Sequence, residues 1–162
     1  LHDIANEKPS TTFVIRSSAK LSSLTSAISY CSKVSAQQHE AIGFDSRKSV
    51  VIPNGVDTSV FKPVPGARAR LKKLADIPDH RLLIGNVARF HPMKDQVRLV
   101  EALSLMRQAR IDVHAVFLGA GHENNIVRET AQREGVSDYV TILPARAEIA
   151  ELLPAFDVFA LS

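Results

Sequence analysis

Short apolar runs alternate with amphipathic stretches from residue 50 to the end of the chain. Four runs are made largely of apolar residues and have strand character: residues 82–88, 113–118, 139–143 and 157–161. The stretches between them carry apolar residues at helical spacing. Strands that alternate with helices form βαβ units, in which the strands are parallel. The sequence therefore predicts an α/β fold built on a parallel sheet.

Helix signals support this alternation. The pattern predicts a short basic helix over residues 67–75, and a helix over residues 123–134 that ends at Gly135. Asp95 is a suitable N-cap for the helix that follows it. Two helices show one apolar face each, formed by Leu99, Ala102, Leu103 and Met106 in the first and by Ile149, Leu152, Leu153 and Phe156 in the second.

The first 49 residues have a different character. They predict a short strand over residues 28–31 and a helix over residues 33–44, and a further strand follows at 50–52. We interpret residues 1–49 as the tail of one domain and residues 50–162 as the first part of the next. The Asn54–Gly55 pair is then a sharp turn between domains rather than a hairpin, with Phe61 anchored in a core.

The ends of the sequence lead us to expect a piece of a longer protein. The chain starts at a Leu and ends in a strand-like run with no successor. If residues 1–49 lack their natural neighbours, apolar side chains there should be exposed or covered by another copy of the chain. Phe13, Ile15 and Ile28 are the side chains to examine.

Composition and charge exclude several classes of protein. The formal net charge is only +3 with a pI of about 9.2, which suits an anionic small ligand or peripheral contact with acidic lipid but argues against nucleic acid. Cys31 is the single cysteine, so neither a disulfide framework nor a cysteine zinc site can form, and a reducing compartment is expected. No apolar run reaches the ~18–20 residues of a membrane span, and no signal peptide is visible.

The segment between the run at 82–88 and the next helix has the features of a phosphate site. It contains Arg89 and Lys94 and leads into a helix start. A helix N-terminus offers unpaired N–H groups and a positive dipole end. Arg89 can bind two phosphate oxygens with its planar fork, and Lys94 adds a point charge. The alternative is that both cations are ordinary solvated loop residues.

Two more loops are expected beside this one, because the loops that follow parallel strands share one rim of the sheet. They are residues 119–123, with the turn Gly119–Ala120–Gly121, and residues 144–147, with Arg146. The glycine turn resembles half of a dinucleotide fingerprint, but Asn124 stands where a third glycine would be needed. Arg146 is either a rim residue or a solvated arginine. The six histidines lack metal-ligand spacing, and no nucleophile elbow or Cys–His pair is evident.

These segments together resemble a retaining glycosyltransferase of group 1, or family 4, with the GT-B fold. Four pieces occur in the family's order: the segment V51-I-P-N-G-V-D57, the strand and loop at residues 85–95, the strand and glycine turn F117-L-G-A-G121, and the strand–helix–strand at residues 140–162. The likeness covers residues 50–162 well and residues 1–49 more loosely. Ala88 departs from the family, which commonly has a glycine before the arginine.

The resemblance implies a Rossmann-like parallel sheet with helices on both faces, within a two-domain architecture. It implies that the later domain binds a nucleotide-diphosphate sugar, and that Arg89 and Lys94 neutralise the leaving diphosphate. Gly119, Gly121 and Arg146 are then further nucleotide-sugar contacts. The resemblance also implies a glycan or lipid-linked acceptor and no need for a metal or other cofactor.

A hexosyltransferase role in cell-envelope or extracellular polysaccharide synthesis follows from the same resemblance. The expected place is the cytoplasm, at the inner face of the membrane, with peripheral membrane contact. The family's pair of glutamates, which contacts the donor sugar, is expected beyond residue 162, so this fragment alone should be inactive. The alternative from another class is a nonenzymatic nucleotide-binding or regulatory α/β module.

Overall fold

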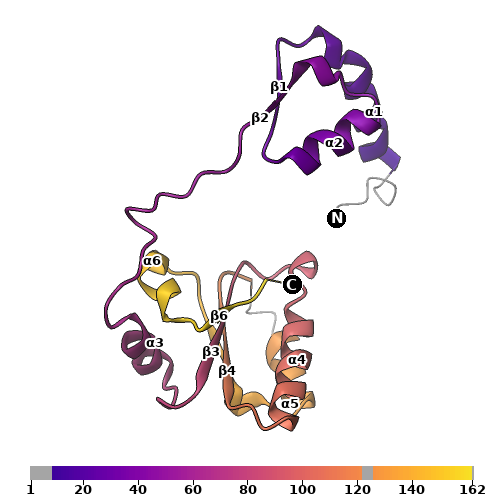
Figure 1. The fold of residues 1–162 in the computed structure, drawn as a ribbon. Helices are drawn as coiled ribbons and strands as arrows, with labels where there is room; N and C mark the ends of the chain where they lie inside the picture. The colour runs from indigo at the N-terminus through magenta and orange to yellow at the C-terminus, as the bar shows by residue number, and fades with distance from the viewer. Residues whose placement is uncertain (1–8, 122–125, 162) are drawn as a thin grey trace. The chain divides into compact units, whose positions relative to one another are not determined.

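The computed structural model describes residues 9–121 and 126–161, which form two compact units divided after Val56. The two units are described separately. Figure 1 shows the order of their helices and strands along the chain. Within the described residues, none of the helices has both the length and the apolar character that crossing a bilayer requires.

The second unit is built on a four-stranded parallel sheet. Its strands are β3 (Leu82–Val87), β4 (Val113–Leu118), β5 (Val140–Leu143) and β6 (Val158–Phe159), in the spatial order β5-β4-β3-β6. Each neighbouring pair is parallel, and β3 and β4 are in register from Leu82 opposite Val113 to Val87 opposite Leu118. The four strands and their parallel arrangement were predicted from the sequence and are confirmed.

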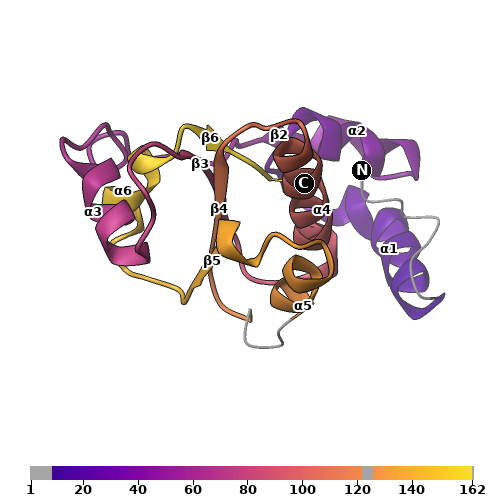
Figure 2. The same cartoon turned by 90° about the horizontal axis from the view of Figure 1, so that it is seen from below.

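Helices cover both faces of this sheet. Helices α3 (Ala67–Ala75) and α6 (Ile149–Leu152) lie on one face, and α4 (Gln96–Gln108) and α5 (Ile126–Arg133) lie on the other (Figure 1, Figure 2). All six residues of β4 are buried, because its alternate side chains enter the two separate cores. Val113, Ala115 and Phe117 face α4 and α5, whereas Val116 and Leu118 face α3 and α6.

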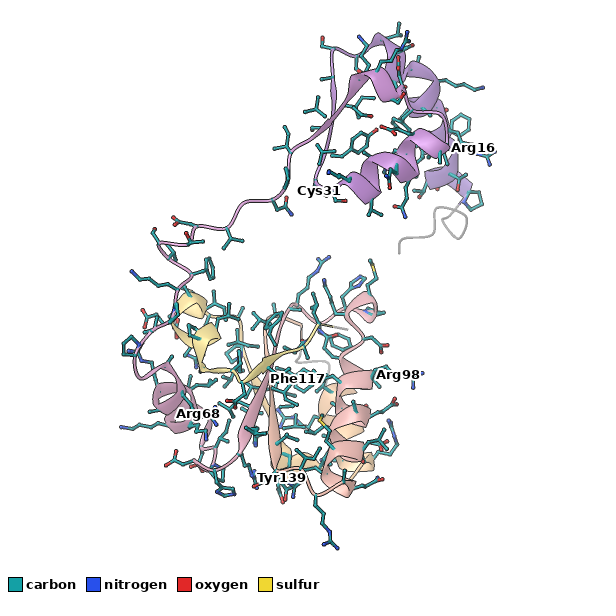
Figure 3. The ribbon with its side chains drawn as sticks, viewed as in Figure 1. Arg16, Cys31, Arg68, Arg98, Phe117 and Tyr139 are labelled. Carbon is teal, nitrogen blue, oxygen red and sulfur yellow. The ribbon has the colours of Figure 1, made fainter. Side chains whose placement is uncertain are left out.

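Short 3₁₀ turns complete the second unit: η4 (Pro92–Lys94), η6 (Ser137–Tyr139) and η7 (Leu153–Ala155). A long-range ion pair ties α3 to the sheet edge, since Arg68 donates to Asp157 Oδ2 at 2.6 Å and the same oxygen accepts from the Leu83 backbone N–H at 2.7 Å. Figure 3 shows Arg68 on α3 beside the sheet. This contact fixes α3 near the start of β3, and the two cores on either face of the sheet hold the strands themselves.

The first unit contains α1 (Pro9–Leu21), η2 (Ser22–Leu24), β1 (Ile28–Tyr30), α2 (Lys33–Ala41), η3 (Ser46–Lys48) and β2 (Ser49–Val51). Strands β1 and β2 pair in parallel, so β2 belongs to this unit, and the structural division lies after Val56 rather than after residue 49. The strand at 28–31 and the helix that starts at Lys33 were predicted, whereas α1 was not. The assignment of the two parts to domains of a larger enzyme stays a prediction.

Exposure in the first unit agrees only in part with expectation. Phe13 is 72% exposed, whereas Ile15 and Ile28 are half-buried.

The Asn54–Gly55 pair lies in irregular chain and forms no hairpin, as predicted, because β2 pairs with β1 instead of with a following strand. The expected anchoring of Phe61 in a core is wrong. Its side chain is 41% exposed and lines a surface groove with Leu153 and Pro154.

Candidate active site

The loop after β3 carries Arg89 and is held against the end of β4. The backbone N–H of Ala88 donates to the Leu118 carbonyl at 3.0 Å, and the N–H of Phe90 donates to the Ala120 carbonyl at 2.7 Å. Arg89 lies between these two bonds. Its side chain is exposed, and its guanidinium has no hydrogen bond or ion pair with the residues that the structure describes. A well-held backbone therefore presents a cation that is open to an anionic ligand.

The glycine turn is needed because two backbones meet there. A Cβ added at Gly119 would lie 2.0 Å from the Ala88 carbonyl oxygen, so no side chain fits at this position. Gly121 has φ +84°, a left-handed conformation that favours glycine, and a Cβ on it would lie 3.3 Å from the Phe90 Cβ. Loops 89–95 and 119–121 are thus in direct contact. This contact was predicted, because both loops follow parallel strands and so lie at the same rim of the sheet. Residues 122–125, including Asn124, lie outside the described residues.

The end of β5 joins the same rim. The Gly119 N–H donates to the Leu143 carbonyl at 3.2 Å, which brings the loop with Arg146 next to the glycine turn. Arg146 itself is half-buried and donates to Glu148 Oε1 at 2.9 Å. Glu148's own backbone N–H, and then the Arg146 guanidinium, lower the pKa of the Glu148 carboxyl. Arg146 is therefore a rim residue whose charge is already shared with a neighbouring carboxylate.

Lys94 ends the short turn η4 and is half-buried. His91 caps this turn, because its Nδ1 accepts from the Met93 backbone N–H at 3.2 Å. Asp95 occupies the N-cap position of α4, as predicted. However, it adopts the left-handed conformation (φ 41°, ψ 45°), and its side chain makes no capping hydrogen bond. The expected side-chain cap is wrong: the backbone carbonyl of Asp95, and not its carboxylate, accepts from the Arg98 N–H in the first turn of α4, at 3.0 Å.

Two buried amides near the loop were not anticipated. Gln96, at the start of α4, is 1% exposed and donates through Nε2 to the Arg89 carbonyl at 3.1 Å. Asn86 is fully buried and donates through Nδ2 to the Ala160 carbonyl at 2.9 Å. The apolar pattern of the sequence could not reveal that these two residues are buried. Each is polar and stands at a position where that pattern expects an apolar core residue.

Comparison with known proteins identifies the family. The family model for glycosyl transferases group 1 matches residues 68–162, which is more than half of the chain and includes all three rim loops. The chain belongs to the group 1 glycosyl transferases.

Individual relatives agree with the family assignment. The GDP-mannose-dependent alpha-(1-6)-phosphatidylinositol monomannoside mannosyltransferase of Mycobacterium tuberculosis is 37% identical over 115 residues, covering 68% of this chain and 29% of the relative. The D-inositol 3-phosphate glycosyltransferase of Segniliparus rotundus is 31% identical over 122 residues, covering 72% and 27%. The chain therefore spans less than a third of the length of these relatives.

A solved structure shows the same fold. The crystal structure of Anabaena Alr3699/HepE in complex with UDP matches with a TM-score of 0.83 and 25% identity, over 99% of this chain and 45% of that one. The α/β fold with a parallel sheet and helices on both faces is the GT-B glycosyltransferase fold, as the resemblance implied.

The opposite rim of this group 1 domain carries a structural cluster. Tyr139 lies at the amino ends of the strands (Figure 3), where the guanidinium carbons of Arg107 and Arg81 lie 3.8 and 4.2 Å from its ring centroid. His114 hydrogen-bonds Thr141 Oγ1 through Nε2 at 2.8 Å. Burial, and then the charge of Arg81, lower the pKa of His114 from 6.5 to about 4. His114 is thus a neutral core histidine. Among the described residues, no group of three His, Cys, Asp or Glu is placed to hold a metal.

Proposed function

We propose that this chain supplies the diphosphate-binding part of a retaining glycosyltransferase of the group 1 family, with Arg89 and Lys94 as the residues that bind the donor. The observation that carries the proposal is the exposed Arg89 guanidinium, which has no partner in the described chain. It projects from a loop bonded to the glycine turn at the carboxyl rim of the sheet. Ligands of open α/β sheets bind at this rim.

The chemistry follows from where charge develops. When the bond between the anomeric carbon of a hexose and the diphosphate oxygen breaks, negative charge grows on the leaving nucleoside diphosphate. Fixed cations at that oxygen stabilise the transition state more than the ground state. Arg89 can form two charge-assisted hydrogen bonds, and Lys94 adds a second positive charge on the same loop. Each contact is worth about 1.5–3 kcal/mol, so these cations can do the work that a metal does elsewhere.

The remaining rim residues have supporting roles in this proposal. Gly119 and Gly121 let the turn pack against the loop that carries Arg89, since a side chain at Gly119 would collide with Ala88. Their backbone is proposed as a further contact for the nucleotide sugar. Arg146 is proposed as a further nucleotide-sugar contact. To bind a phosphate or ribose, its guanidinium would have to share its donors between the ligand and Glu148, which it already bonds at 2.9 Å.

The biological setting is proposed from the functions for which similar proteins are named. HepE was solved with UDP, and one relative is named as GDP-mannose-dependent, so both uracil and guanine nucleotides are candidates. Relatives named for phosphatidylinositol mannoside and inositol phosphate support a lipid-linked or sugar-like acceptor. We place the whole protein in cell-envelope or extracellular polysaccharide synthesis, in the cytoplasm at the inner face of the membrane. The parts of relatives that this chain does not span should be needed for transfer, so the chain alone should bind donor without transferring sugar.

Calorimetric titration of the chain with UDP and with GDP tests the proposal. Replacing both Arg89 and Lys94 by Ala should weaken binding of the tighter nucleotide roughly a hundredfold or more, because two charge-assisted contacts are lost. Affinity for the wild type should also fall with salt, because the contacts are ionic. The matched control removes an Arg and a Lys elsewhere, at Arg133 in the last turn of α5 and at Lys73 on α3, both exposed.

The control pair should keep wild-type affinity. Equal affinity in the Arg89/Lys94 variant and the wild type would remove the diphosphate assignment, and so would the absence of binding by either nucleotide. Transfer of sugar by the chain alone would show that the segments it lacks relative to the longer proteins are not required.

A further inference from the structure

We propose that Gln96 is a positioning residue of the diphosphate site, which sets the direction of Arg89 by binding its backbone carbonyl. The inference rests on the proposed function, since it concerns the same arginine. The contact joins Gln96 Nε2 to the Arg89 oxygen at 3.1 Å across seven residues of chain, from the first turn of α4 back to the loop.

The backbone geometry of the loop explains why this bond is needed. Successive residues of an extended strand turn their backbone groups to opposite neighbours. Ala88 and Phe90 direct their N–H groups to Leu118 and Ala120, on the β4 side. The carbonyl of Arg89 instead accepts from the Gln96 side chain, beyond the last pairing of β6 with β3 at Gly85. The Gln96 amide takes the place of a strand partner there.

The burial of Gln96 points to a role beyond packing. The side chain is 1% exposed, and its Oε1 is buried with no hydrogen-bond donor among the residues that the structure describes. A buried unpaired carbonyl oxygen lowers stability, and an apolar side chain of the same length would avoid that loss. What the amide provides and a methionine cannot is the donor on the Arg89 carbonyl. This donor fixes the peptide from which the guanidinium projects.

A fixed peptide matters for affinity because a preorganised arginine loses less freedom when it binds. Gln96→Met keeps the length and apolar volume of the side chain and removes the donor. We expect it to weaken binding of the nucleoside diphosphate about threefold to tenfold, the range that corresponds to one neutral hydrogen bond. The loss should require Arg89, because Gln96 acts only through it.

A double-mutant cycle separates this role from a general loss of structure. UDP or GDP, whichever the wild type binds more tightly, is titrated into four proteins: wild type, Gln96→Met, Arg89→Ala and the double variant. We expect Gln96→Met to weaken binding in the wild-type background and to have no further effect when Arg89 is already Ala. Thermal unfolding of each protein checks that it is folded. If Gln96→Met does not fold, Gln96→Leu, which also lacks the donor and carries no charge, replaces it in the cycle.

The outcomes separate the inference from the proposed function. If Arg89→Ala binds as tightly as the wild type, the proposed function fails and the role of Gln96 fails with it. If Arg89→Ala binds weakly and the Gln96 variant binds normally, only the positioning role is overturned. The positioning role is also overturned if the loss of affinity caused by Gln96→Met adds in full to the loss caused by Arg89→Ala. A residue that acts through Arg89 cannot weaken binding when the Arg89 side chain is absent.

Discussion

Replacing Gly119 with Ala should destabilise the second unit and disturb the site at once. The new Cβ would lie 2.0 Å from the Ala88 carbonyl oxygen, where real Cβ atoms essentially never come closer than 3.0 Å. The ends of β3 and β4 must therefore separate by roughly 1 Å, which overpacking data place at about 1–3 kcal/mol. Separation also strains the bonds from Phe90 to Ala120 and from Gly119 to Leu143, each worth about 0.5–1.5 kcal/mol.

The expected loss is about 2–6 kcal/mol, a large part of the ~5–15 kcal/mol by which a domain is usually stable. Urea unfolding followed by circular dichroism measures it directly. Gly55→Ala is the matched control, because nothing lies within 4 Å of its added Cβ, and it should change stability by no more than about 0.5 kcal/mol. An unfolding midpoint for Gly119→Ala equal to that of the control would refute the argument that close backbone approach requires this glycine.

Two further predictions concern His114 and Asp95. Because the native pKa of His114 is about 4 and its ordinary value is 6.5, the unfolded chain takes up a proton that the native state excludes. Stability should then fall by about 3 kcal/mol as the pH drops from 6.5 to 4; the same fall in His114→Gln would contradict this cause. Asp95 has left-handed backbone angles, so Asp95→Gly should stay within about 0.5 kcal/mol of the wild type in urea unfolding, whereas Asp95→Val should lose about 1–2 kcal/mol. Equal stability of the two Asp95 variants would show that the backbone there is not strained.

The sheet could be predicted because its signal is local and repeated. Strand β4 is buried along its whole length and therefore forms a continuous apolar run in the sequence. Helix α3 was predicted with its observed ends, and Pro78 lies beyond it in the sequence. Helix α1 was missed because its sequence is rich in Ser and Thr and has no acidic residue in the first turn.

The rim loops were predicted from topology, and their detailed geometry was not. Strands β3 and β4 are parallel, so their carboxyl ends lie side by side. Arg89 therefore lies between two hydrogen bonds that join these strand ends. The Gln96 contact has no local pattern, because it depends on how α4 returns over the loop. The left-handed Asp95 was also not predicted, since Asp is common at a helix start and its usual role there is a side-chain cap. Whether Lys94 shares a cleft with Arg89 stays a prediction.

A crystal structure of this chain with UDP or GDP tests the central claim most directly. We predict that the diphosphate lies at the carboxyl ends of β3 and β4, with its oxygens roughly 3 Å from the Arg89 guanidinium and the Lys94 ammonium. A second cavity that contains lysines exists at the opposite rim, where Lys72 and Lys73 line a pocket with Asp76 and Asp79. A diphosphate bound in that pocket, with Arg89 and Lys94 left in solvent, would contradict the account.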